Sequence, residues 1–358
     1  AELVQDGIVI ESGMEASQGG RPRSILSINP RYGYFIGVEV GDTLSRIELF
    51  DLTLQKLGAV AYPVVLSENQ PEQVVQYIHQ GVKAVLAESG ITLENVLGIG
   101  VSVGGIVEQV EHVFAYIPSW GWRSVPLATL LEERFQVPIY LENAAKVMAQ
   151  AEGFFGAGQG YEHLAVLLVA TGIGAGIIAD GSLYRGAGNS AGEWGHMTIE
   201  LDGRLCRCGS RGCLEAYAGA PGIIASLKEM VPRSPLLHEN DQESTVAAIV
   251  DAARNGDFTA TQVLKDTAHY LGVGIANLIN LFNPQLILLG GWAGLQIGAY
   301  ILPELHQFVE RYALKQPLSL TRIDLCQLGQ DAVAMGAATL VLEQFLTTTG
   351  RQNPPSLM

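Results

Sequence analysis

The stretch "LAVLLVATGIGAGIIA", residues 164–179, contains two apolar runs separated by a glycine-containing corner. Glycines interrupt it before it reaches the roughly 20 apolar residues that a membrane-spanning helix needs, so the two runs predict two buried strands. A similar unit occurs earlier in the chain, in "YFIGVEVGDTLSRIELFDL", residues 34–52. Two strand–glycine–strand units predict a duplicated architecture, with one unit in each half and a cleft between the halves.

Helical patterns alternate with strands around both units. In residues 68–90, Pro71 stands near the start, apolar residues recur at helical spacing, and Gly90 provides a stop, as expected of a helix. "PQLILLGGWAG", residues 284–294, is typical of a buried strand that ends in a glycine pair, and residues 331–346 form a closing helical pattern. This alternation predicts an α/β protein with largely parallel strand pairing.

The bulk composition limits the class of protein. At 358 residues, with 48% hydrophobic and 16% charged residues, the chain is globular and long enough for two lobes. Four cysteines are too few for a disulfide scaffold, and no secretory leader is recognisable, which favours the reducing cytoplasm. The net charge of −15 argues against nucleic-acid binding by the body of the protein.

The first 32 residues differ from the rest. Residues 3–13 and 24–30 are predicted to form two strands on either side of a glycine-rich turn that carries Arg21 and Arg23. This basic turn is either a solvated loop or the wing of a winged-helix domain, which would insert into the minor groove of DNA. In the second case the helices that precede a wing would lie upstream of Ala1.

The strongest chemical signal is "GHMTIELDGRLCRCGSRGCLE", residues 195–215, which contains His196, Cys206, Cys208 and Cys213. Three thiolates and one imidazole suit a tetrahedral zinc ion, and a closed set of four ligands predicts a structural site. The alternative is scattered thiols or a redox pair. Cys206 and Cys208 are too close in sequence for an easy disulfide, which favours the metal.

Two carboxylates flank this segment. Glu193 and Glu215, together with His196, could accept hydrogen bonds from sugar hydroxyls, or the two glutamates could be surface or capping residues. The glycine corners at residues 37–43 and 170–176 could each bring backbone N–H groups to a phosphate, although plain tight turns also explain them. Asp42 in the first corner would repel an anion, so that corner is poorly suited to ATP.

Beyond these single motifs, the order of segments resembles the ROK family (repressors, open reading frames and sugar kinases) over nearly the whole chain. The segments that carry the resemblance are "SWGWRSVPL" (119–127), "ATGIGAGIIADGSLYRGAGNSAGEWGH" (170–196), "CRCGSRGCLEAYAG" (206–219), "LILLGGW" (286–292) and "AVAMGAATLVLE" (332–343). The resemblance implies a two-lobed hexokinase–actin-like (ribonuclease H-like) fold, with a sugar in the interlobe cleft and one structural zinc ion beside it.

The resemblance also implies residue roles. The implied zinc ligands are His196, Cys206, Cys208 and Cys213. The implied sugar contacts are Asn143, Glu193, His196 and Glu215.

The resemblance further implies a division of the chain. Residues 1–32 would be the wing hairpin and linker of an N-terminal winged-helix domain, whose reading helices are absent from this sequence. Residues 33–143, joined by the helix at about 332–347, would form the small lobe. Residues 144–331 would form the large lobe, with the zinc loop at 196–213.

The chain departs from the kinase pattern at two places. Kinase members resemble "ENDAN" where this chain has "ENAAK", residues 142–146, so Ala144 replaces the aspartate that acts as general base. A positioned base contributes about 10²–10⁴-fold in rate. The first phosphate loop of kinases resembles "DIGGTK", whereas this chain has Glu39, Asp42 and Leu44 at the aspartate, second glycine and lysine positions. Losses at both ends of one phosphoryl transfer predict a degenerate kinase without catalytic residues.

We therefore expect a regulator of the branch that includes the xylose and N-acetylglucosamine repressors. It would repress carbohydrate-utilisation genes, bind a sugar or a sugar phosphate as effector, and contact operator DNA through its N-terminal region as a cytoplasmic homodimer or homotetramer. Lys146, which adds a positive charge beside Ala144, is the reason to consider a phosphate. The alternatives are an ATP-dependent, glucose-type hexose kinase that uses another carboxylate such as Glu142, and a metal-stabilised interaction module without a small ligand.

Overall fold

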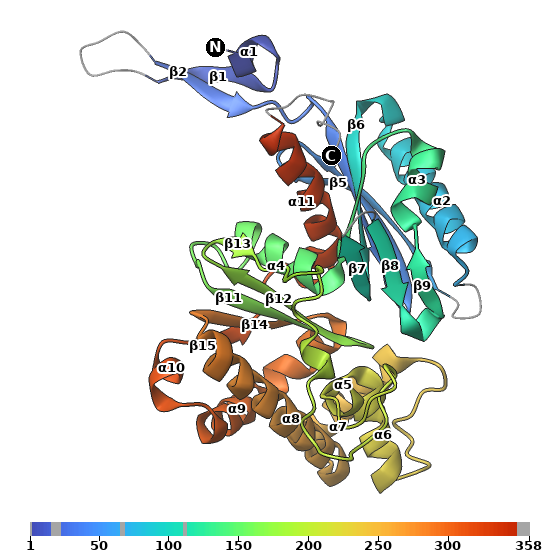
Figure 1. The fold of residues 1–358 in the computed structure, drawn as a ribbon, viewed down its shortest axis with the longest axis vertical. Helices are drawn as coiled ribbons and strands as arrows, with labels where there is room; N and C mark the ends of the chain where they lie inside the picture. Colours follow the sequence, from blue (N-terminus) through green and yellow to red (C-terminus); the bar gives the residue numbers. More distant parts are fainter. Residues whose placement is uncertain (1, 16–22, 65–68, 110–112, 349–358) are drawn as a thin grey trace. The chain divides into compact units, whose positions relative to one another are not determined.

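A computed structural model describes residues 2–15, 23–64, 69–109 and 113–348 of the chain. By its internal contacts the chain divides into two compact units. Unit 1 consists of Ala1–Val103, Pro126–Glu142 and Ala337–Met358, and unit 2 consists of Gly104–Val125 and Asn143–Gly336. Each unit contains a five-stranded sheet, and Figure 1 shows the two sheets.

The sheet of unit 1 contains, in spatial order, β10 (Ile139–Asn143), β6 (Val96–Val103), β3 (Tyr34–Val40), β4 (Leu44–Asp51) and β5 (Lys56–Pro63). Strands β3 and β4 are antiparallel neighbours, and β3 and β6 are parallel. The predicted strand–glycine–strand unit at residues 34–52 is thus confirmed. The remaining regular elements of the unit are α1 (Glu2–Gln5), β1 (Val9–Glu15), β2 (Arg23–Ile28), α2 (Pro71–Ser89), η2 (Leu93–Asn95), α3 (Leu127–Phe135) and the C-terminal part of α11 (Ala332–Thr347).

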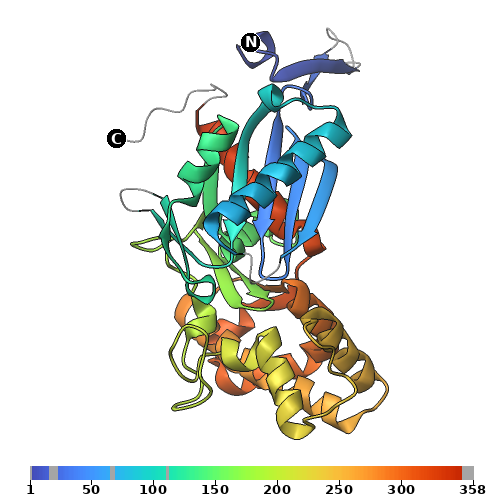
Figure 2. The same cartoon turned by 90° about the vertical axis from the view of Figure 1, so that its right-hand side faces the viewer.

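Helices cover both faces of this sheet (Figure 2). Gly81 of α2 lies against Ile47 of β4, and Gly100 of β6 lies against the backbone of Ala337 in α11. The residues of β3 that pair with Ile47 and Gly100 are neighbours in sequence, and successive residues of a strand point to opposite faces. Helices α2 and α11 therefore pack on opposite sides, and glycine allows the close approach on each.

The N-terminal hairpin is confirmed as an antiparallel pair of β1 and β2, with Glu15 opposite Arg23 at its outer end. The predicted first strand was wrong over its first residues, because α1 occupies Glu2–Gln5 and the strand begins only at Val9. Gly7, with φ of +79°, breaks the helical turn before the strand. Arg23 is exposed, whereas Arg21 lies outside the described residues.

The sheet of unit 2 contains, in spatial order, β13 (Ser182–Leu183), β12 (Ile173–Ala179), β11 (Leu164–Val169), β14 (Leu286–Gly290) and β15 (Arg322–Leu325). Its order matches that of unit 1, with an antiparallel hairpin on one side of the central strand and a parallel neighbour on the other. The predicted duplication is confirmed. The expectation of largely parallel pairing was too simple, because each glycine corner makes an antiparallel hairpin.

Besides the first residues of α11, ten helices and three strands complete the described part of unit 2. They are β7 (Ile106–Gln109), β8 (Val113–Ile117), η3 (Pro118–Trp120), β9 (Trp122–Val125), α4 (Ala144–Phe155), η4 (Trp194–His196), α5 (Glu215–Ala218), α6 (Ala220–Met230), α7 (Gln242–Arg254), α8 (Phe258–Phe282), α9 (Trp292–Tyr312), α10 (Lys315–Ser319) and η5 (Gly329–Asp331). Strands β7–β9 form a separate antiparallel sheet.

The five-stranded sheet of unit 2 is also covered on both faces. Helix α4 packs closely on one face, where a Cβ on Gly176 would lie 2.4 Å from the Ala149 side chain. The alternate residues, such as Leu167 and Ala175, point into a hydrophobic core shared with α6–α9. Among the described helices, none is long and apolar enough to cross a membrane.

Candidate functional site

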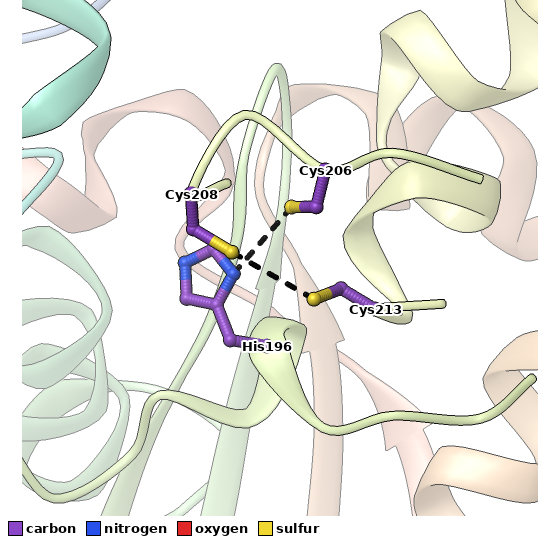
Figure 3. Close-up of side chains that lie close together, drawn as sticks. All are labelled: His196, Cys206, Cys208 and Cys213. Carbon is purple, nitrogen blue, oxygen red and sulfur yellow. Dashed lines mark hydrogen bonds between the residues drawn. The ribbon is translucent and has the colours of Figure 1, made fainter. Parts of the chain in front are cut away.

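Four potential metal ligands converge in unit 2. One ligand atom from each of His196, Cys206, Cys208 and Cys213 lies within 4.8 Å of the others (Figure 3). Sγ of Cys208 is 3.8 Å from Sγ of Cys213, and Sγ of Cys206 is 3.7 Å from Nδ1 of His196. Bonds of about 2.0–2.3 Å from a tetrahedral ion place its ligand atoms roughly 3.3–3.8 Å apart. The cluster could therefore hold a metal ion.

The backbone of this loop is fixed by turns that need glycine. The Gly209 amide donates to the Cys206 carbonyl at 3.0 Å, which closes a turn around Cys208, and φ of Gly209 is +92°. At Gly212, φ is +73° and a Cβ would lie 1.7 Å from the Glu200 carbonyl oxygen. The loop therefore brings its cysteines together through a conformation that other residues adopt only with strain.

The three thiols of the cluster differ in the direction of their pKa shifts. Burial raises the pKa of Cys206 and of Cys213. For Cys208, burial alone would raise the pKa. Hydrogen bonds from the Ser210 backbone and from the neighbouring thiols outweigh this effect, so the pKa of Cys208 is lowered. A bound cation would stabilise all three thiolates and remove the penalty that burial imposes on them.

His196 links this cluster to the neighbouring carboxylate. Its Nδ1 faces Cys206, while its Nε2 lies 3.8 Å from Oε2 of Glu193. If Nδ1 binds a metal, Nε2 carries the proton and points toward an acceptor, an arrangement common around metal-bound histidines. His196 can therefore belong both to the predicted metal ligands and to the predicted sugar contacts.

A cavity of about 200 Å³ adjoins the cluster, and the described residues that line it all belong to unit 2. The four predicted sugar contacts, Asn143, Glu193, His196 and Glu215, all line this cavity, and so does Ala144. Sequence reasoning missed three further polar residues of the lining. These are Tyr116, Ser119 and Arg207.

Asn143 is held in one orientation at the start of α4. Its Oδ1 accepts hydrogen bonds from the backbone amides of Ala145 and Lys146, at 2.9 and 3.3 Å, and so caps the helix. Its Nδ2 donates to the Gly105 carbonyl at 2.8 Å. The next residue, Ala144, also lines the cavity, and its side chain is only a methyl group.

Glu215 is similarly fixed and is only 7% exposed. Its Oε2 accepts a hydrogen bond from the Ile173 amide at 2.9 Å, and its Oε1 lies 3.4 Å from Nε of Arg207. A Cβ on Gly172 would lie 3.0 Å from both Arg207 and Glu215, so the glycine corner makes room for this ion pair. Within the corner that we considered for phosphate, the Ile173 amide thus donates to a carboxylate of the protein itself.

Glu193 is the more accessible carboxylate, with its side chain 34% exposed. Burial raises the pKa of Glu193, while the positive charges of His196 and Lys146 lower it and Glu215 raises it, with a net increase. Lys146 itself is 2% exposed, and its Nζ donates to the backbone carbonyl and to Oδ1 of Asn189. Among the described residues, Lys146 is not part of the cavity lining.

Comparisons with known proteins agree with the fold. The model of the ROK family matches residues 35–344. A putative xylose repressor from Caldicellulosiruptor sp. (strain Rt8B.4) is 32% identical over 349 residues, which cover 96% of this chain and 87% of that protein.

The solved structures that are similar to the chain include a regulator and a kinase. One is a ROK family transcriptional regulator described as a homologue of the E. coli MLC protein, with a TM-score of 0.80 and 25% identity over 96% of this chain and 86% of that one. The other is a ROK family glucokinase from Streptomyces griseus in complex with glucose and AMPPNP, with a TM-score of 0.76 and 29% identity. The glucokinase match covers 99% of that enzyme but only 86% of this chain.

Proposed function

Because this chain belongs to the ROK family and has the two-lobed, actin-like fold of its kinases and regulators, we propose that it is a ROK-type transcriptional regulator. It represses carbohydrate-utilisation genes and responds to a sugar or sugar phosphate. The effector binds in the cavity of unit 2, where Asn143, Glu193, His196 and Glu215 accept or donate hydrogen bonds to its hydroxyls.

The observation that carries this proposal is the chemistry of the cavity lining. The carboxylates suited to sugar hydroxyls line it, whereas a methyl group, that of Ala144, stands at the position where the kinase pattern has its base. A site with acceptors but without that base can bind a sugar and has no group at that position to take its proton. Binding without turnover is what a sensor requires.

The metal proposed for the cluster is zinc, one ion per chain, with a structural role. Three sulfur atoms and one nitrogen are the donors that zinc prefers, and the closed set leaves no open position for catalysis. The ion would keep Glu193 and Glu215 in place through His196 and the cysteine loop.

The N-terminal hairpin supports the regulatory part of the proposal. The match to the ROK family model begins at residue 35, after the hairpin, whereas the match to the putative repressor covers 96% of this chain and therefore extends into the hairpin. We propose that residues 1–32 are a wing and linker and that Arg21 and Arg23 contact operator DNA. The proposed division continues with a small lobe at 33–143 and a large lobe at 144–331.

Similarity to sugar kinases favours the kinase alternative, and one example is the solved glucokinase with bound nucleotide. The kinase alternative would need a base other than residue 144. Glu142 is 1% exposed, so its carboxylate is removed from solvent, which does not suit an easily reached proton acceptor. We therefore favour the regulator.

Calorimetric titration tests the proposal. The protein is titrated with pentoses, hexoses, N-acetylhexosamines and their phosphates, and separately with ATP. The expected result is saturable heat with one class of sugar and none with ATP. The absence of binding by every sugar would contradict the proposal and favour an interaction module, and nucleotide binding would favour the kinase.

A further inference from the structure

Two cysteines of the metal cluster lie on a short hairpin. We call residues 204–212 the cysteine hairpin, because they carry Cys206 and Cys208 (Figure 3). Its two arms are joined at the base, where the Gly212 amide donates to the Arg204 carbonyl at 2.9 Å. Ordering such a segment by metal binding costs chain entropy, and the cost is smaller if other contacts already hold the base. The structure shows which contacts do so.

The side chain of Arg204 ties the base of the cysteine hairpin to helices α5 and α6. Its Nη1 donates to the carbonyls of Ala216 and Gly222, at 3.4 and 3.3 Å. Its Nη2 donates to Oγ of Ser226 at 3.1 Å and to Oε2 of Glu229 at 2.6 Å. Gly222, Ser226 and Glu229 recur at helical spacing, so they share one face of α6. Because a planar guanidinium can donate to several acceptors at once, it fixes the hairpin relative to this face.

Tyr217 of α5 contacts both the backbone and the side chain of the same arginine. Its hydroxyl oxygen accepts a hydrogen bond from the Arg204 amide at 2.7 Å, and its ring centroid lies 4.8 Å from Cζ of the guanidinium. A Cβ on Gly203 would lie 2.2 Å from this hydroxyl, so a glycine is needed for the close approach. Tyr217 is buried, and its ring packs on that of Tyr270 in α8, with the centroids 4.5 Å apart. The support of Arg204 is therefore itself firmly packed.

The contacts of Arg204 differ in how much they can contribute. The side chain of Glu229 is 62% exposed, and an ion pair at the surface adds little. The Arg204 side chain is only 24% exposed, so its contacts with the carbonyls, with Ser226 and with the Tyr217 ring compete less with water. Most of the support for the hairpin therefore comes from the contacts that face the protein.

Arg204 is also connected to the segment that carries the last cysteine of the cluster. Cys213 directly follows Gly212, whose amide donates to the Arg204 carbonyl. Helix α5 begins two residues after Cys213, and its Ala216 carbonyl accepts from the guanidinium. We propose that Arg204, packed on Tyr217, is a positioning residue that holds the base of the cysteine hairpin before a metal ion binds. This role rests on the metal site proposed above.

Metal affinity of the full chain tests this role. Arg204→Met removes the polar contacts of the side chain, so the dissociation constant for Zn²⁺, measured by competition with a chromophoric chelator, should rise roughly tenfold or more. Arg211→Met is the matched control, because it removes the same charge from the same hairpin, where the Arg211 guanidinium donates to the Gly203 carbonyl at 3.2 Å. Its dissociation constant should stay within about threefold of that of the unaltered protein. Equal changes in the two variants would overturn the positioning role.

A conservative substitution separates the shape of the side chain from its charge. Arg204→Lys keeps the positive charge, but a single ammonium cannot reach the acceptors on α5 and α6 together. This variant should therefore bind Zn²⁺ nearly as weakly as Arg204→Met. Recovery of the unaltered affinity in Arg204→Lys would show that the charge alone matters, and it would refute the proposal.

Amide hydrogen exchange on the unaltered protein keeps the proposal testable if Arg204→Met does not fold. After a chelator has removed the metal, the Gly212 amide at the base should exchange at least about tenfold more slowly than the Gly209 amide near the tip. Equally fast exchange of both amides would show that the metal alone orders the hairpin and would overturn the proposal.

The same measurements distinguish this role from the metal site on which it rests. If the unaltered protein binds no Zn²⁺, the proposed metal site is refuted, and the positioning role with it. If the unaltered protein binds Zn²⁺ and Arg204→Met binds it equally well, only the positioning role is refuted.

Discussion

The two sides of the cavity differ in how they relate to the kinase pattern. On the side of the metal loop, residues 193–215, the two carboxylates line the cavity and the four potential metal ligands converge beside it. On the side of α4, the cap Asn143 is retained, but Ala144 and Lys146 depart from the pattern. Under the proposed function, sugar binding and phosphoryl transfer would depend on separate groups of residues, so that a protein could lose the second function and keep the first.

The largest effect is expected on the metal-loop side. Cys208→Ser, or removal of the metal by a chelator, should release the loop that orients His196 and Glu215, and sugar affinity should fall by roughly 100-fold or more. Metal content by mass spectrometry and calorimetric titration would measure both effects. Cys326→Ala, which alters a cysteine outside the cluster, serves as the control. Unchanged sugar affinity in the metal-free protein would contradict the proposal that sugar binding depends on the metal.

The next-largest effect is expected on stability, from substitutions of the glycines that fix the backbone of the same loop. Gly212→Ala combines a left-handed φ with a clash against the Glu200 carbonyl and should lower the free energy of unfolding by about 2–5 kcal/mol. At Gly209, φ is also positive, but nothing lies within 4 Å of an added Cβ, so Gly209→Ala should cost only about 1–2 kcal/mol. Denaturant unfolding of the two variants would compare them. Equal losses of unfolding free energy in the two variants would mean that the close approach of Gly212 to the Glu200 carbonyl does not add to the cost of the substitution.

A substitution of Glu193 tests the lining of the cavity itself rather than the metal loop that supports it. Hydrogen bonds to a charged group contribute about 1.5–3 kcal/mol, so Glu193→Gln should weaken sugar binding roughly 10- to 100-fold with little change in the unfolding midpoint. Glu239→Gln, at an exposed position outside the described lining, is the matched control. Equal affinity in the two variants would remove Glu193 from the proposed set of sugar contacts.

The smallest effect is expected on the α4 side. Ala144→Asp should leave sugar affinity within a few fold and should produce no sugar-dependent ADP, because Glu39, Asp42 and Leu44 still depart from the kinase phosphate loop. Adding Glu39→Asp, Asp42→Gly and Leu44→Lys to Ala144→Asp is the change expected to yield activity. Turnover by Ala144→Asp alone would show that the first glycine loop can support phosphoryl transfer. It would then contradict the prediction that changes in this loop also prevent kinase activity.

Part of the structure could be predicted because local rules determine it. The glycine corners marked both hairpins, and Gly90, which ends α2 in the left-handed conformation, was recognisable as a helix stop. The metal cluster was predictable because three of its four residues lie within eight positions, so a single loop can bring them together. In both cases short sequence separation carried the information.

Other features depend on contacts between distant segments. Helix α9 contains Pro303, which obscures its helical pattern, and the first residues of the chain formed α1 where a strand was expected. Arg207 stands between two cysteines that drew attention to the metal, while its role depends on Glu215 and Gly172. The charge of Lys146 was noticed, but only the fold showed that it faces Asn189.

The central claim is that the chain binds a sugar without phosphorylating it. The most direct measurement is sugar-dependent ADP formation, with ATP and magnesium, on a sample whose sugar binding has been established by calorimetry. The account predicts saturable sugar binding and an ADP rate no higher than that with ATP alone. A sustained rate that requires the sugar and scales with protein concentration would contradict it.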